Sequence, residues 1–73
     1  MMVEETRAMA RIVAQIARDH PAAIAGPAEF WARITGLAVE ETTEALEALA
    51  ARGVVRCQAL GTQQFFVADP PHA

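Results

Sequence analysis

The segment 39–68 constrains the fold most, because a helical pattern within it leads directly into a hairpin pattern. Gly53 supplies the residue type best suited to the left-handed end of a helix. Two strand-like runs, 54–60 and 63–68, are separated by Gly61-Thr62, and a type II′ turn prefers glycine in its first central place. We therefore predict a helix at 39–52 followed by an antiparallel hairpin. The buried side of that helix should be formed by residues at helical spacing, namely Val39, Thr42, Ala45, Leu46 and Leu49.

A first helix is predicted at residues 3–19 and ends at His20, because the residue before a proline is pushed out of the helical region. The apolar run 22–25 suits a minor strand. A second helix then begins with Gly26 at its cap and Pro27 in the first helical position. The apolar stripe of the first helix is Met9, Ile12, Val13 and Ile16. The second helix has Phe30, Trp31 and Ile34, and is followed by the Gly36-Leu37 turn, with Leu37 pointing inward.

Residues 30–55, FWARITGLAVEETTEALEALAARGVV, resemble the centre of winged helix-turn-helix domains in small bacterial transcriptional regulators. The resemblance rests on the Gly36-Leu37 turn, on Leu46 and Leu49 in the helix after it, and on the run 52–55. It implies an α+β fold with three helices and a small antiparallel sheet, whose C-terminal hairpin is the wing. We expect this domain at residues 1–68 and a tail at 69–73. An alanine-rich chain whose basic residues are all arginine indicates a bacterial gene of high GC content.

The helix at 39–52 would be the DNA-reading helix of such a domain, yet its charge is unsuited to that task. At about 100° per residue, Glu40, Glu44 and Glu47 gather almost opposite the buried side, and Glu41 flanks them. Carboxylates beside phosphates repel them, whereas phosphate contacts by basic side chains supply most of the affinity for DNA. The net charge of −3 also argues against general nucleic-acid binding.

The first helix shows the opposite charge on its outer side, where Arg7, Arg11 and Arg18 lie close together. One interpretation is a solvated face with local pairs from Glu4. The other is that the arginines and the glutamates are complementary surfaces, which meet in a homodimer or contact different partners.

In the predicted hairpin, the more apolar face should pack on the helices and the other face should leave an apolar patch outside. The wing tip, GTQQ, has no basic residue to reach a phosphate. The inward face is Val55, Cys57, Ala59, Phe66 and Ala68, and the outward apolar residues are Leu60, Phe65 and Val67.

Other candidate sites are mostly discounted. Cys57 is expected to be a small buried hydrophobe, and with His20 and His72 it has no metal-ligand spacing. Trp31 is expected in the core, with an interface anchor as the alternative. We predict no catalytic residue, metal site, cofactor or small-molecule ligand. Without a spanning segment or a signal-peptide pattern, the expected compartment is the cytoplasm.

Two functions follow from these observations. The first is a non-catalytic module for protein–protein contacts, which could belong to gene regulation; its interface residues would be Glu40, Glu44 and Glu47, with Phe65, Trp31, Arg7, Arg11 and Arg18 as secondary candidates. The alternative, implied by the resemblance, is a DNA-binding transcriptional regulator acting as a dimer; its DNA contacts would come from Thr43, Arg33, Arg52 and Arg56.

Overall fold

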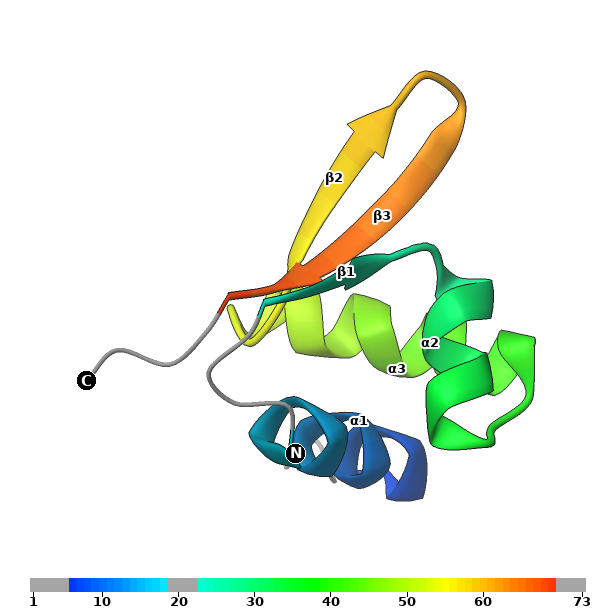
Figure 1. Ribbon diagram of the computed structural model, residues 1–73, viewed down its shortest axis with the longest axis vertical. Helices are drawn as coiled ribbons and strands as arrows, with labels where there is room; N and C mark the ends of the chain where they lie inside the picture. The colour runs from blue at the N-terminus through cyan, green and yellow to red at the C-terminus, as the bar shows by residue number, and fades with distance from the viewer. Residues whose placement is uncertain (1–5, 19–22, 70–73) are drawn as a thin grey trace.

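The computed structural model describes residues 6–18 and 23–69. In this part of the chain the elements run α1 (Arg7–Arg18), β1 (Ile24–Gly26), α2 (Ala28–Thr35), α3 (Val39–Ala51), β2 (Arg56–Leu60) and β3 (Gln63–Ala68). The strands form one antiparallel sheet in the order β1-β3-β2. The helices lie on one side of this sheet, and the β2–β3 hairpin extends beyond them (Figure 1). The predicted α+β fold of three helices and a small antiparallel sheet with a C-terminal hairpin is confirmed, and its order of elements is consistent with a winged-helix-like topology.

Helix α1 begins later than predicted, at Arg7 and not at residue 3. Thr6 lies outside the helix, and its hydroxyl oxygen accepts a hydrogen bond from the backbone N–H of Met9 at 3.1 Å. This is the bond of an N-cap threonine, which satisfies one of the free N–H groups of the first turn. Residues 3–5 and the predicted stop at His20 lie outside the described residues.

The start of α2 is also shifted from its predicted position. Gly26 is the last residue of β1 and Pro27 is the N-cap, in extended conformation with φ −71° and ψ 170°. A Cβ at Gly26 would lie 2.5 Å from Cδ2 of Phe30, so the strand can approach α2 this closely only with glycine. The predicted minor strand is therefore present but lies at Ile24–Gly26 and not at residues 22–25, and Gly26 serves packing instead of capping.

Glycine ends two elements as predicted and starts the wing turn. Gly36 is the left-handed C-cap of α2 with φ 74°, and its N–H donates to the carbonyl of Ala32 at 2.8 Å. Gly53 follows α3 with φ 80°. Gly61 has φ 66° and Thr62 has no positive φ, as the predicted type II′ turn requires. The predicted register is confirmed, since Leu60 pairs with Gln63, Gln58 with Phe65, and Arg56 with Val67.

The core lies between the three described helices and the base of the sheet. Its largest buried side chains are Trp31, Phe66, Met9, Ile12, Leu46, Leu49 and Thr42. The indole N–H of Trp31 donates to the carbonyl oxygen of Phe66 at 3.0 Å, which joins α2 to β3 inside the core. The predicted burial of two residues is wrong, because Val13 is 38% exposed and Val39 is 46% exposed. Each lies at the margin of its apolar stripe, where the neighbouring elements cover it only in part.

The wing is only half covered by helices. Val55, Phe66 and Ala68 are buried on its inner side, as predicted. Cys57 and Ala59, predicted to be buried on the same side, are exposed. β2 is an edge strand of the sheet, and all of its residues are exposed. The hairpin that it forms with β3 extends past the helices (Figure 1). On the outer side Leu60 is 58% exposed, while Phe65 and Val67 are half-buried.

Candidate functional site: the acidic face of α3 and the surfaces around it

The outer side of α3 is an acidic surface. Thr42, Ala45, Leu46 and Leu49 turn inward and are buried. Glu40, Glu44 and Glu47 are exposed on the opposite side, and Glu41 is exposed on its flank. Two of them, Glu40 and Glu41, lie in the first turn, where negative charge favours the positive end of the helix dipole. That local role does not extend to Glu44 and Glu47, which lie beyond the first turn.

A hollow that sequence reasoning missed lies beside this acidic face, between α3 and the N-terminal half of α1. Its volume is about 310 Å³. Ala8 and Met9 of α1 and Ala45 and Ala48 of α3 form an apolar lining, while Glu41 and Glu44 supply the carboxylates. The small side chains of Ala45 and Ala48 leave this space open. They were visible in the sequence, but the hollow exists only because a second helix packs across them.

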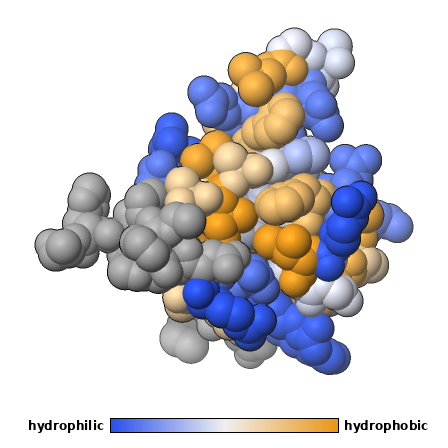
Figure 2. Space-filling model, viewed as in Figure 1, coloured by the Kyte–Doolittle hydropathy of each residue, from blue (hydrophilic) through white to orange (hydrophobic). Residues whose placement is uncertain are grey.

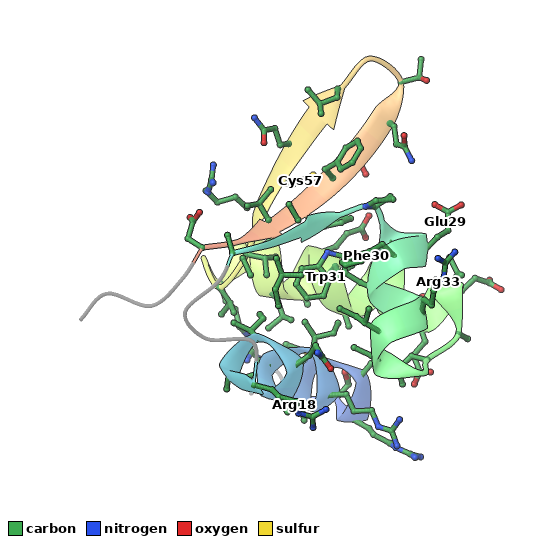
Figure 3. The ribbon with its side chains drawn as sticks, in the orientation of Figure 1. Arg18, Glu29, Phe30, Trp31, Arg33 and Cys57 are labelled. Atoms are coloured by element: carbon green, nitrogen blue, oxygen red, sulfur yellow. The ribbon has the colours of Figure 1, made fainter. Side chains whose placement is uncertain are left out.

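The three arginines predicted to form a basic row, Arg7, Arg11 and Arg18, are exposed on α1. Figure 3 shows Arg18 on the side of α1 that faces away from the sheet. Arg11 is partly engaged, because its guanidinium donates from Nη1 to the carbonyl oxygen of Thr35 at 3.2 Å. Arg11 and Arg18 also line a shallow hollow of about 230 Å³ between α1 and α2. The basic row therefore borders α2, whereas the acidic hollow borders α3.

The residues proposed for DNA contact come from different elements of the fold, and one of them is paired with a carboxylate. Arg56 forms a bidentate ion pair with Asp69, with Nε–Oδ2 at 2.9 Å and Nη2–Oδ1 at 3.0 Å. The hydrogen bond with Asp69, followed by its negative charge, raises the pKa of Arg56. The Thr43 hydroxyl donates to the carbonyl of Val39 within α3 at 2.8 Å. Arg33, on α2, and Arg52, after α3, are exposed.

Trp31 and Phe65, the two aromatic candidates for a protein interface, differ in burial. Trp31 is 0% exposed and bonded to the backbone of β3, so the alternative of a surface anchor is wrong and the core interpretation is confirmed. Its neighbour Phe30 packs edge-on at 6.3 Å between ring centroids and is half-buried (Figure 3). Phe65, on the outer side of the wing, is half-buried. Figure 2 shows hydrophobic side chains on the wing interrupted by hydrophilic ones.

Cys57 is an exposed free thiol on β2, contrary to its predicted burial. His20 and His72 lie outside the described residues. Among residues 6–18 and 23–69, no group of three histidine, cysteine or acidic side chains could hold a metal ion. Within the same ranges, no helix has both the length and the apolar character needed to cross a membrane.

Comparison with known proteins adds no identification. No family model matches the chain, and neither the curated proteins nor the solved structures contain a match to it.

Proposed function

We propose that this chain is a non-catalytic winged-helix interaction module, which contacts protein through the acidic face of α3. The observation that carries the proposal is the exposure of Glu40, Glu41, Glu44 and Glu47 on one helix. This is the helix that the resemblance to bacterial regulators would place in the DNA groove. A role in gene regulation through protein contacts is compatible with that resemblance.

Electrostatics supports protein over DNA as the partner of this face. A groove-bound helix offers cationic or amide side chains to phosphates and base edges. Here it would bring four carboxylates close to the phosphates, with Thr43 as its neutral polar residue, and the hydroxyl of Thr43 is already bonded to its own helix. Outside the helix, Arg56 is neutralised by Asp69. A positively charged protein surface is the complementary partner, and such pairing favours orientation and rapid association.

The competing function is a dimeric DNA-binding regulator that contacts DNA through Arg33, Arg52, Arg56 and Thr43. Arg33 and Arg52 are exposed and support this alternative. The two functions differ in one measurable property, which is the affinity for duplex DNA at low salt.

We would therefore titrate fluorescent duplex DNA with the wild-type protein at low and moderate salt. No binding is expected at low salt. The variant Glu44→Lys should gain binding, because the change removes a repulsive charge from the face that would meet phosphates. Glu29→Lys is the matched control, since Glu29 is an exposed acidic residue on α2 and the change in charge is the same. Micromolar binding by the wild-type protein that falls steeply with salt would overturn the proposed function.

A further inference from the structure

We propose that the protein contacted by the acidic face is a second copy of this chain, whose Arg7 enters the hollow between α1 and α3 and pairs with Glu41 and Glu44. This inference rests on the proposed function, because it names the partner of the same face. It combines three features, namely the hollow between α1 and α3, the basic row on α1, and an exposed apolar side of α1.

The side of α1 that the other described elements leave exposed is apolar. Met9 and Ile12 face the core, and α1 contacts both α2 and α3 on that side. At about 100° per residue, a second set of residues lies away from the core. This set is Ala10, Val13, Ala14 and Ala17, and all four are exposed. Figure 1 places α1 at the margin of the fold, with the sheet on the far side of the other helices. A copy seated here would cover Val13, which the core leaves 38% exposed.

The two borders of this apolar side carry opposite charges. On the border toward α2 lie Arg18 and Arg11, which bonds to Thr35. Arg7 falls on the same side of α1 at helical spacing. On the border toward α3 lies the hollow with Glu41 and Glu44. The chain therefore contains both halves of a charge-complementary contact. Among the described residues, no ion pair joins Arg7 to Glu41 or Glu44 within one molecule.

Symmetry decides how two copies can meet. In a two-fold dimer, each surface contacts its own equivalent. If the two-fold axis ran across α1, the arginine border would lie over the partner's arginine border and like charges would meet. If the axis runs along α1, the arginine border of one copy lies over the acidic border of the other. Charge complementarity therefore selects the second arrangement, with the two α1 helices side by side and parallel.

The same symmetry identifies the arginine that enters the hollow. A two-fold axis along α1 leaves positions along the helix unchanged. The hollow lies beside Ala8 and Met9, at the start of α1, and Arg7 is the arginine at that level. Arg18 lies at the other end of the described helix. The apolar stem of an arginine suits the alanine and methionine lining, and its guanidinium can bond two carboxylates at once.

Charge exchange followed by sedimentation velocity tests the dimer. Wild-type protein should self-associate, and more weakly as salt is raised, because screening weakens exposed charge pairs. Arg7→Glu and the double variant Glu41→Arg/Glu44→Arg should each weaken self-association by about tenfold or more, since like charges then meet. The triple variant that carries all three changes should recover it. A mixture of the Arg7→Glu chain and the Glu41→Arg/Glu44→Arg chain should form a heterodimer.

Arg18→Glu is the matched control, because it makes the same change in charge on the same helix, away from the hollow. It should leave the dimer nearly unchanged. Val13→Asp should abolish the dimer while circular dichroism shows an intact fold, because Val13 is 38% exposed and is not one of the buried core residues. A wild-type monomer at every accessible concentration and at low salt would overturn the inference. So would an Arg18→Glu effect equal to that of Arg7→Glu, or a triple variant that does not recover.

The outcomes separate this inference from the proposed function. A monomeric protein that does not bind duplex DNA removes the second copy as partner and leaves the proposed function standing. A dimer that shows the predicted charge exchange but binds DNA with micromolar affinity supports the dimer and overturns the proposed function.

Discussion

Trp31 donates its indole N–H to the carbonyl oxygen of Phe66 across 3.0 Å, and both side chains are almost fully buried. The bond joins the second helix to the central strand of the sheet, two elements that are far apart in the sequence. It satisfies the only polar atom of the largest side chain in the core. The wing is therefore attached to the helical layer by a polar contact as well as by apolar packing.

Replacing Trp31 by Phe should lower the free energy of unfolding by about 2–4 kcal/mol, because a buried hydrogen bond is lost and the smaller ring leaves a void. Urea denaturation followed by circular dichroism measures the loss. Phe30→Leu is the control, since Phe30 is a half-buried neighbour and should lose less. Equal losses in the two variants would show that the bond to Phe66 contributes little.

Replacing Thr42 by Val should change the free energy of unfolding by less than about 1 kcal/mol. Thr42 is fully buried, and its hydroxyl donates to the carbonyl of Ala38 at 2.8 Å. The backbone N–H of Thr42 donates to the same oxygen at 2.9 Å, so removing the hydroxyl leaves that acceptor satisfied. Thr42→Ala also opens a cavity and should cost more. A loss above about 2 kcal/mol for Thr42→Val would contradict this account, since it would imply that the hydroxyl has a further role.

Replacing Gly26 by Ala should destabilise the fold by about 1–3 kcal/mol, because the new methyl group overpacks the contact with Phe30. Its Cβ would lie 2.5 Å from Cδ2, 2.7 Å from Cγ and 2.9 Å from Cβ of Phe30. In a Phe30→Ala background the same change should cost less, because the two ring contacts are gone while the Cβ contact remains. If Gly26→Ala destabilised the fold equally in both backgrounds, the cause would be the strand backbone and not the contact with the Phe30 ring.

Cys57 should react completely with a thiol reagent in the native protein, without denaturant. The prediction follows from its exposure on β2, an edge strand of the sheet. Absorbance of the released chromophore from a disulfide reagent gives the stoichiometry and rate. A Cys57→Ser variant supplies the blank and should keep the wild-type stability, since surface substitutions usually change stability by less than about 0.5 kcal/mol. Labelling that requires urea would mean that the thiol is covered in solution.

Local chemistry made the secondary structure predictable, because helix spacing and glycine positions act over a few residues. Gly36, Gly53 and Gly61 each have the positive φ that their sequence context implied. The hairpin register followed from the position of the turn. The α1 start was missed although its signal, the N-cap threonine Thr6, was present in the sequence.

The acidic face of α3 was also predictable from the sequence, because a helical projection needs no tertiary information. In contrast, the sequence did not predict how far the residues at the margins of each apolar stripe are buried. Val13 and Val39 share the periodicity of the core residues, yet the neighbouring elements cover them only in part. Cys57 alternates correctly with the inner face of the wing, but it lies on the edge strand β2 and is exposed.

The sequence by itself determined which segments are helix, turn and strand, and which side of α3 carries the carboxylates. These properties depend on the chemistry of residues a few positions apart. The tertiary structure alone decided that α1 and α3 enclose a hollow beside Glu41 and Glu44, that Arg56 pairs with Asp69, and that Trp31 bonds to β3. Each of these joins residues far apart in the chain, and their distance is set by how the helices and the sheet pack.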